Sequence, residues 1–414
     1  MSAHDKSSTP QAAPLDLSKW RKVPNLLIGI GGALALLGAV LNLKQFAYSW
    51  LTAYMFVLSF VLGALFLVLV HHLFDASWSV PIRRVCEHIA ALSFPWMAVF
   101  FLPVALLAKT IFEWIKIDPH TDHALHAKYP LFTTAGFYLV AIFCFVCWWF
   151  LSTRLRYWSL KQDKTGGADC TRQMRLLASI GIFLFAITLT FAAIMWMKAL
   201  QHQWFSTMYG VYYFAGTVWT TLATVYLITA VLQRQGYLKD VVHSDTYYFL
   251  GSLLFAFTVF YAYIHFSQYF IIWNANMPEE TFWYKLRETG SWWDIGQVII
   301  FGHFFVPFLA LLRIDAKLYL PLMAFLGGWA WLMHFVDICF NVLPVSNPQN
   351  FPLQWIWLPL GSAAFMIGCL CNAFLRQFLA HPPYPVKDPR LAESLNIYVP
   401  PASTAGAASH GGAK

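Results

Sequence analysis

Ten long apolar runs constrain this chain more than any other feature of its sequence. They lie near residues 24–43, 51–71, 86–109, 132–153, 174–198, 206–233, 244–275, 293–312, 317–343 and 352–379. Each is long enough to cross a bilayer core of about 30 Å, which takes roughly 20 helical residues. Backbone N–H and C=O groups find no water inside lipid, so runs of this length must be helical. The sequence therefore predicts an all-α polytopic membrane protein whose ten transmembrane helices occupy residues 23–380.

Composition supports this class and argues against a nucleic-acid partner. Of the 414 residues, 59% are hydrophobic and only 11% are charged, whereas a soluble domain carries about 25% charged residues. The net charge of +8 comes from basic residues between the apolar runs. Basic residues in such positions set membrane topology. We find no RNA or DNA motif and expect the partners to be the lipid bilayer and other proteins.

The distribution of basic residues predicts the orientation. The N-terminus, the even-numbered loops and the C-terminus hold 20 Lys and Arg, against 7 in the odd-numbered loops. By the positive-inside rule, both termini are cytoplasmic. Residues 1–22 then form a cytoplasmic arm and residues 381–414 a cytoplasmic tail. Because the tail is rich in Pro, Ala, Gly and Ser, we expect it to be extended or disordered unless a partner orders it.

One predicted helix carries a polar stripe. Tyr261, His265 and Gln268 lie at i, i+4 and i+7 and so share one helix face, while the other faces are apolar. The helix is followed by Pro278 and two glutamates, which suit the first turn of a short interfacial helix. Intramembrane polar groups normally face a bundle interior or a water-filled cavity, so the stripe is a candidate site. The alternative is a histidine satisfied by a neighbouring helix.

Ionisable residues inside the predicted membrane domain fall into two clusters. The inner cluster, toward the cytoplasm, comprises His71, His72, Asp75, Glu87 and His88. The outer cluster comprises His265, His303, His334 and Asp337, with Asn341 beside them. Histidine titrates near neutrality, so we interpret the clusters as two proton half-channels. The competing interpretation is that these groups pair with one another to join helices.

A stripe of threonines lies between the two clusters. Its members, at helical spacing, are Thr217, Thr220, Thr221 and Thr224. Such hydroxyls can order water where the half-channels meet. The alternative is that they bond back to carbonyls of their own helix.

The sequence lacks the motifs that hold redox cofactors. It has no facing histidine pairs for a b-type haem, no CxxCH, no Walker or GxGxxG loop, and no cysteine set for an iron–sulfur cluster. The loop 110–130 contains His120, His123 and His126. We expect a solvated loop there, because structural zinc sites need four convergent ligands. We therefore expect neither a cofactor-binding nor a metal residue in this chain.

Several segments resemble one family of respiratory membrane subunits. These are WFSTMYGVYYFAG (204–216), LLFAFTVFYAYIHFSQYFIIWNANMPEETFWY (253–284) and GHFFVPFLALL (302–312), with shorter support from WSVPIRRVCE (78–87), KYPLF (128–132) and SLKQD (159–163). They are similar to the ActF subunit of bacterial alternative complex III, an NrfD/PsrC-like polytopic protein. The resemblance covers roughly residues 24–345.

The resemblance implies a fold of two four-helix bundles plus two flanking helices. It also implies a quinol:cytochrome c, or other electron-acceptor, oxidoreductase complex in the bacterial inner membrane. Its partners there would be the NrfD-like ActC, the iron–sulfur subunit ActB and haem c subunits, together with the quinone pool. In that family ActC is the better candidate for quinol oxidation. The resemblance thus assigns this chain proton conduction and assembly, with quinone interaction as a further possibility.

The runner-up function is a free-standing secondary transporter. Such proteins bind substrate at the membrane midplane, between inverted repeats with broken helices. Glycine and proline interruptions at matching places in the two halves are not evident in this sequence.

Overall fold

A computed structural model of the chain describes residues 18–395. The described residues form helices and turns and contain no β-strand. Ten helical segments among them are long and apolar enough to cross a membrane. This confirms the fold class and the number of spans predicted from the apolar runs.

Eight α-helices form most of the spans, and two spans are composite. The single helices are α1 (Ser18–Leu41), α2 (Leu43–Phe74), α7 (Thr134–Thr165), α8 (Ala168–Trp196), α9 (Tyr209–Arg234), α10 (Ser244–Ala275), α15 (Leu320–Val342) and α16 (Trp357–Leu379). The third span joins η1 (Ser77–Ser79), α3 (Val80–Ala90), η2 (Ala91–Ser93) and α4 (Trp96–Leu106), and the eighth joins α12 (Ser291–Ile299), the π-helical segment η5 (Ile300–Phe305) and α13 (Val306–Leu311). Short connecting elements are α5 (Ala108–Ile111), η3 (Glu113–Lys116), α6 (His123–His126), η4 (Lys198–Gln201), α11 (Pro278–Arg287), α14 (Ile314–Leu318), η6 (Leu343–Val345), η7 (Leu353–Trp355) and α17 (Leu391–Ser394).

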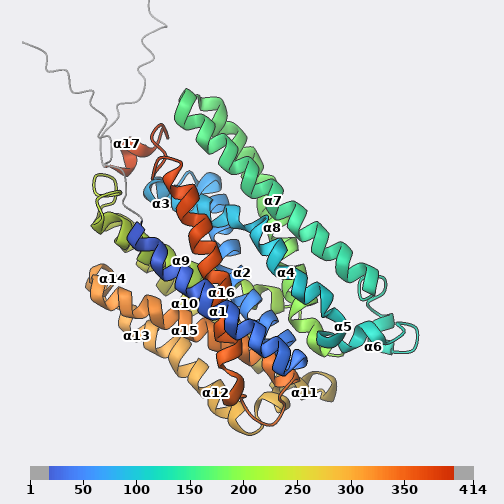
Figure 1. Cartoon of the computed structure of the whole chain (residues 1–414). Helices are drawn as coiled ribbons and strands as arrows, with labels where there is room; N and C mark the ends of the chain where they lie inside the picture. Colours follow the sequence, from blue (N-terminus) through green and yellow to red (C-terminus); the bar gives the residue numbers. More distant parts are fainter. Residues whose placement is uncertain (1–17, 396–414) are drawn as a thin grey trace, which may run out of the picture.

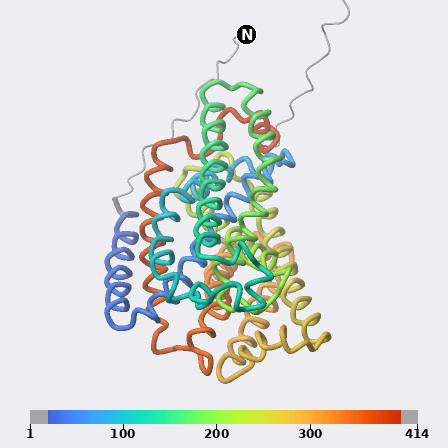
Figure 2. The backbone as a smooth tube through the Cα atoms, turned by 90° about the vertical axis from the view of Figure 1, so that its right-hand side faces the viewer, coloured from blue at the N-terminus to red at the C-terminus, as the bar shows by residue number. Residues whose placement is uncertain are grey.

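The spans pack as two groups of four with a flanking pair (Figures 1 and 2). In the first group α2 packs against α3, α4 and α8, and α7 packs along α8. In the second group α9 packs against α10 and α15, α10 contacts α13, and α12 contacts α15. Helices α2 and α9 join the two groups, while α1 lies along α16 and α16 lies against α2. This arrangement matches the expected two four-helix bundles with two flanking helices.

Small residues allow the closest helix approaches. A Cβ on Gly63 of α2 would lie 2.1 Å from Thr221 Oγ1 of α9, so only glycine fits where the two bundles meet. A Cβ on Gly31 of α1 would lie 2.5 Å from the carbonyl oxygen of Gly361 on α16. Close backbone contact through small residues is a principal source of helix association in membranes.

The two ends of the bundle differ in what they carry. The α17 end holds the start of α3, the turn between α7 and α8, and α17. The α11 end holds α5, α6, α11 and α12. The short helix expected from Pro278 is confirmed as α11 (Pro278–Arg287), and Asn276, in the left-handed conformation at φ 48°, separates it from α10. Because the described chain has ten spans, α1 begins and α16 ends on the same side.

Two spans are irregular in ways that the sequence did not indicate. The third span is interrupted after Ser93, where Phe94 is extended (φ −144°, ψ 135°) and Pro95 precedes α4. The eighth span contains the π-helical turn η5. These are the second span of one bundle and the third span of the other, so the interruptions do not lie at matching places.

Candidate functional site

Asp337 is the buried acid at the centre of the polar residues in the α11 half of the second bundle. It lies on α15 with 2% of its surface exposed. The Tyr212 hydroxyl, from α9, donates a hydrogen bond to Asp337 Oδ1. Asn341 Nδ2 donates to the Tyr212 oxygen at 3.1 Å and to the Asp337 carbonyl at 2.8 Å, and Tyr209 donates to Asn341 Oδ1 at 2.9 Å. Asp337 and Asn341, one turn apart on α15, are thus joined to each other directly and through Tyr212 of α9.

A chain of hydrogen bonds runs from Asp337 to the polar stripe of α10. The Tyr212 and Tyr261 hydroxyl oxygens are 3.1 Å apart, and the Tyr261 oxygen is 3.4 Å from His265 Nδ1. Each hydroxyl has one proton to donate. With Asp337 ionised, the Tyr212 proton points at the carboxylate, so Tyr261 donates to Tyr212. The His265 Nδ1–H then donates to Tyr261. All three bonds run toward Asp337, and protonation of Asp337 allows the same chain to run in the opposite direction.

A cavity of about 390 Å³ lies beside the His265 end of this chain. It is bounded by α10, α11, α12, η5 and the Phe340 side chain of α15. Its polar lining residues are Tyr261, His265, Tyr269, Tyr284, Arg287, Glu288 and Gln297. The rest of the lining is apolar, and Phe266 and Trp293 at its edge are 62% and 51% exposed. The cavity therefore combines a polar inner wall with an apolar rim on the surface that faces lipid.

His303 belongs to the outer cluster through ring stacking. Its imidazole lies between the rings of Tyr261 and Trp219, with centroid distances of 3.6 and 3.9 Å. Both ring nitrogens are buried, and within the described part of the chain neither has a hydrogen-bond partner. His303 lies within the π-helical turn, and such turns are frequent at functional sites.

His334 lies apart from the Asp337 chain, at the contact between the two bundles. Its Nε2 is 2.8 Å from Ser59 Oγ of α2, and the Ser59 hydroxyl lies 3.4 Å from the Tyr213 oxygen. The ring packs so closely on Gly216 that a Cβ there would lie 2.9 Å from it. No hydrogen bond joins His334 to Asp337 in the described part of the chain. In the predicted outer cluster, His265 and Asp337 are thus the two ends of one hydrogen-bonded chain, His303 stacks on Tyr261, and His334 lies apart from this chain.

Two of the four threonines in the stripe bond back to their own helix, and the other two do not. Thr221 and Thr224 donate back to the carbonyls of Thr217 and Thr220, at 2.8 and 2.7 Å. Among the described residues, the buried hydroxyls of Thr217 and Thr220 have no hydrogen-bond partner. Half of the stripe is therefore satisfied by its own helix, and the other half presents unsatisfied hydroxyls next to the bundle contact.

Gln268 and Arg287 close the outer cluster toward the α11 end. Gln268 accepts from Ser206 at 2.7 Å and donates to the Tyr284 hydroxyl at 3.1 Å. Arg287, on α11, donates to the carbonyls of Phe340 and Asn341 at 3.0 and 2.9 Å. Burial lowers the pKa of Arg287 to about 9, so its guanidinium remains charged at neutral pH. A fixed positive charge thus lines the cavity at this end.

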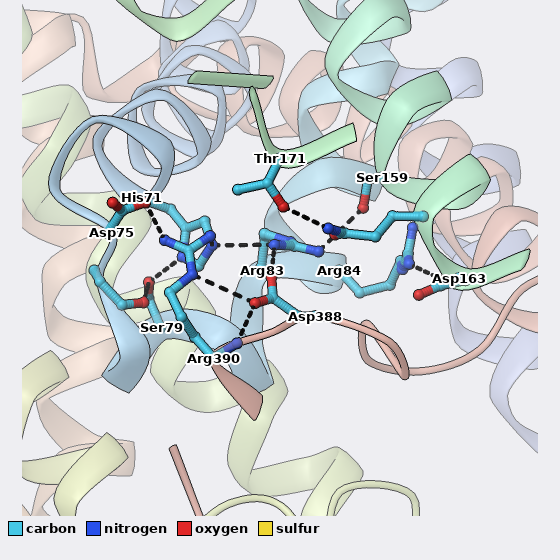
Figure 3. Close-up of polar contacts among 12 residues, drawn as sticks. His71, Asp75, Ser79, Arg83, Arg84, Ser159, Asp163, Thr171, Asp388 and Arg390 are labelled. Atoms are coloured by element: carbon cyan, nitrogen blue, oxygen red, sulfur yellow. Dashed lines mark hydrogen bonds and ion pairs between the residues drawn. The ribbon is translucent and has the colours of Figure 1, made fainter. Parts of the chain in front are cut away.

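At the α17 end, His71, Asp75 and Glu87 of the inner cluster lie beside or within a larger set of ion pairs, which we call the arginine network and of which Figure 3 shows a part. It consists of Arg83, Arg84, Arg175 and Arg390 with Asp75, Glu87, Asp163 and Asp388. Four basic and four acidic side chains therefore balance. Arg83 is 1% exposed and contacts Glu87 at 3.2 Å and His71 Nε2 at 3.1 Å, and it also pairs with Asp388.

The inner histidines differ in their contacts. His71 borders the arginine network: its Nε2 is 3.1 Å from an Arg83 guanidinium nitrogen and its Nδ1 is 2.5 Å from Ser79 Oγ. His72 and His88 are buried, and within the described residues their ring nitrogens have no hydrogen-bond partner. His88 packs on the rings of Phe374 and Phe378, both at 6.1 Å. Of the five residues predicted for the inner cluster, Asp75 and Glu87 therefore form ion pairs, His71 is hydrogen-bonded, and His72 and His88 pack against rings.

The first part of the C-terminal tail differs from the disorder expected for it. Residues 381–395 fold back over the α17 end, where Asp388 is 5% exposed and pairs with Arg83 and Arg390. The Val386 amide donates to Asp163 Oδ1 at 3.0 Å. Ionic contacts within the chain thus order a segment whose composition alone indicated an extended tail. Residues 396–414, and most of the N-terminal arm, lie outside the described residues.

The two clusters are separated by apolar packing. In residues 18–395 we find no hydrogen bond that links His334, or the hydrogen-bonded chain that ends at Asp337, to the arginine network. A cavity of about 190 Å³ lies between α2, α3, α9 and α10 next to His71 and Arg83, and most of its lining is apolar. A proton path between the inner and the outer cluster would therefore need water molecules, because side chains alone do not connect the two clusters.

The histidine-rich loop makes a helix cap. Asp122 Oδ1 accepts from the amides of Ala124 and Leu125 at 2.8 and 3.1 Å at the start of α6, and Asp122 Oδ2 is 3.1 Å from His202 Nε2. The His120 and His126 rings meet edge-on, with centroids 5.7 Å apart. Within the described ranges, no three His, Cys, Asp or Glu side chains are grouped in a way that would hold a metal ion.

Several residues of these sites were not found from the sequence. They are Tyr209, Tyr212, Arg287, Arg83, Arg84, Asp388 and Arg390. A signal existed for Arg83 and Glu87, whose i, i+4 spacing places them on one helix face. Sequence comparison finds no family model that matches the chain and no match among curated proteins.

Proposed function

We propose that this chain is an integral membrane subunit of a quinol-oxidising respiratory complex, without a redox cofactor of its own, that conducts protons through the outer cluster. The observation that carries the proposal is the hydrogen-bonded chain from His265 through Tyr261 and Tyr212 to the buried Asp337. Proton relays need connected groups that can exchange protons, and buried acids on transmembrane helices commonly take this part.

The complex would be that of the family the sequence resembles, alternative complex III, in a bacterial inner membrane with both termini cytoplasmic. Electrons would pass from quinol oxidised at ActC through the iron–sulfur clusters of ActB and the haem c of the haem c subunits. The chain itself would contribute the proton path and a surface for assembly. The large exposed apolar residues on α7 and α8, such as Leu139 and Phe183, would lie against lipid or such partners.

The cavity beside His265 supports a contact with the quinone pool. Its apolar rim opens where acyl chains would lie, and its inner wall presents Tyr261, His265 and Arg287 as hydrogen-bonding groups. Ligand pockets combine apolar walls with a few convergent polar groups in this way. A quinone head in the cavity would place its oxygens next to the start of the relay.

Purification tests the assignment to a complex. The tagged chain is extracted from native membranes in mild detergent, and haem c is followed by absorbance and iron–sulfur clusters by electron paramagnetic resonance. We expect both signals to co-elute with the tag and not with a tagged unrelated membrane protein. A chain that elutes alone, with no redox signal, would contradict the proposal and favour the secondary transporter.

Filling the cavity tests the contact with quinone. A Cβ on Gly296 would lie 3.7 Å from the Phe340 ring, an ordinary contact, so α12 accepts a side chain there. We expect Gly296→Leu to weaken binding of a short-chain quinone by about tenfold, or about 1.4 kcal/mol. The matched control is Gly328→Leu on α15, where a Cβ meets nothing within 4 Å. Equal quinone binding by both variants would exclude this cavity as the binding site.

A further inference from the structure

Two lysine side chains share one aromatic site at the α11 end of the first bundle. Lys128 precedes α7, and Lys198 begins η4 immediately after α8. The Lys128 Nζ lies 5.2 Å from the ring centroid of Phe132 and 4.1 Å from that of Phe205. The Lys198 Nζ lies 5.6 and 5.7 Å from the same two rings. Two amines from different loops are therefore held together between one pair of phenylalanines.

These amines have few acceptors for their protons. Lys128 donates to the carbonyl of His202, and Lys198, which is 6% exposed, donates to no oxygen acceptor in the described residues. A lysine ammonium carries three donors, so most of the donors in the site are unused. No carboxylate of the described chain forms an ion pair with either lysine. The nearby Asp122 is occupied by the amides of α6 and by His202.

Two neighbouring ammonium groups repel each other in a buried site, and two outcomes relieve the repulsion. Either one amine loses its proton, or an anion lies between them. Burial, followed by the charge of Lys128, lowers the pKa of Lys198 to about 7. Without an anion, Lys198 is therefore only partly protonated at neutral pH. An anion between the two amines would favour the charged form of Lys198.

We propose that Lys128 and Lys198 form a binding site for a phosphate group, supplied by the headgroup of an anionic phospholipid. The phosphate oxygens would accept the unused lysine donors, as ammonium groups commonly do for phosphates. The site lies at the ends of two spanning helices, at the level where headgroups lie. Phe205 at its edge is 47% exposed, and Leu139 on the adjoining face of α7 is 65% exposed. Acyl chains would follow that apolar face. This inference does not depend on the proposed function.

Native mass spectrometry of the full-length protein tests the site. The detergent-purified chain is titrated with phosphatidylglycerol and, separately, with phosphatidylcholine. We expect Lys128→Gln and Lys198→Gln each to weaken phosphatidylglycerol binding about tenfold, the size expected for a lost charged hydrogen bond. The exposed Lys116 lies at the same end of the bundle, so Lys116→Gln is the matched control and should bind as the wild type does.

Further measurements distinguish a lipid phosphate from free phosphate and show whether the variants are folded. Inorganic phosphate that displaces phosphatidylglycerol at millimolar concentration would identify free phosphate as an occupant of the same site. No displacement would identify the lipid. Lys198→Arg keeps the charge and should retain binding, and all variants must melt near the wild-type temperature. Folded Gln variants that bind phosphatidylglycerol as tightly as the wild type would overturn the proposal.

The proposal also makes the binding depend on pH. The titratable groups that face the two lysines are Asp122 and His202, which pair with each other at 3.1 Å. Phosphatidylglycerol should bind more tightly at pH 6 than at pH 8, because Lys198 gains its proton over this range. In His202→Gln, which removes the imidazole that pairs with Asp122 beside the site, the pH dependence should persist. Its loss in that variant, or its persistence in Lys198→Gln, would contradict the role of Lys198.

Discussion

Replacing Asp388 by asparagine removes one of the four negative charges that balance four arginines at the α17 end. The Asp388 carboxylate and the Arg83 guanidinium that it pairs with are both fully buried. Removing one partner of a buried ion pair typically costs about 3–5 kcal/mol, because the other charge is left unpaired. Asparagine keeps one oxygen as an acceptor, so we expect the lower figure of about 3 kcal/mol. At about 2–4 °C per kcal/mol for a large domain, the melting temperature should fall by roughly 6 °C or more.

Free buried cysteines provide the assay. Cys86, Cys144, Cys170 and Cys339 are buried thiols, so a thiol-reactive fluorophore reports unfolding of the detergent-solubilised protein. The control is Asp315→Asn, which breaks the exposed pair of Asp315 with Arg313. Exposed pairs contribute little, and its melting temperature should stay within about 1 °C of the wild type.

Proteolysis and a second substitution sharpen the result. Lys387 should become a faster site for trypsin in Asp388→Asn, because the tail loses its buried contact. Adding Arg390→Gln removes one positive charge and restores the balance of the network, so the double variant should recover part of the lost stability. A melting temperature for Asp388→Asn within about 1 °C of the wild type, or strictly additive losses in the double variant, would refute the argument from charge balance.

The pH dependence of this contact has a defined sign. Burial alone would raise the pKa of Asp388, but Arg83, the Arg390 amide and the Arg390 guanidinium hold it below its usual range. A carboxyl group with a lowered folded pKa stabilises the protein above its unfolded value of about 4, and this stability is lost as the pH falls through the lower folded pKa. The difference between wild type and Asp388→Asn should therefore be constant from pH 5 upward and shrink only in strong acid.

Two further predictions concern the other sites. Asp337→Asn keeps the shape of the side chain but removes the carboxyl group at the end of the hydrogen-bonded chain. The intact complex should therefore assemble and oxidise quinol, but with reduced proton translocation in vesicles. Undiminished proton translocation would show that Asp337 has only a structural role. Lys198 has a folded pKa of about 7, below its unfolded value, so the unfolded state binds more protons between about pH 7 and 10 and stability should rise with pH over that window. In detergent without anionic lipid, the melting temperature of Lys198→Met should lack this rise, and an identical pH profile would contradict the burial of the amine.

The sequence predicted the spans well because their cause is local. Each run is long enough to cross the membrane, and lipid leaves its backbone no alternative to a helix. The break at Phe94 and the π-helical turn around His303 were not predicted, because the length and overall hydropathy of a run do not show where its helix is interrupted. Their geometry depends on packing against neighbouring spans, which periodicity does not contain.

The candidate site was predicted in part for a similar reason. The spacing of Tyr261, His265 and Gln268 indicated a polar face, because helical spacing alone determines which residues share a face. Tyr212, which joins that face to Asp337, is one of 19 tyrosines in an aromatic-rich chain and had no distinguishing neighbour in sequence. The contact of Asp388 with Arg83 joins residues that are 305 positions apart. No local pattern encodes such a pairing.

The two clusters predicted as proton half-channels differ in the groups that surround their acidic side chains. In the arginine network each acid faces guanidinium groups that stay protonated at any physiological pH, so moving a proton onto Glu87 or Asp388 would leave an arginine uncompensated. In the outer cluster Asp337 is held by neutral hydroxyl and amide donors. Its protonation requires only that the hydroxyls of Tyr212 and Tyr261 reverse direction. The α11 end therefore offers a chain of groups that can exchange protons, whereas the acids at the α17 end are paired with arginines that stay charged. This difference favours proton movement in the outer cluster and a structural role, ordering the tail, for the arginine network.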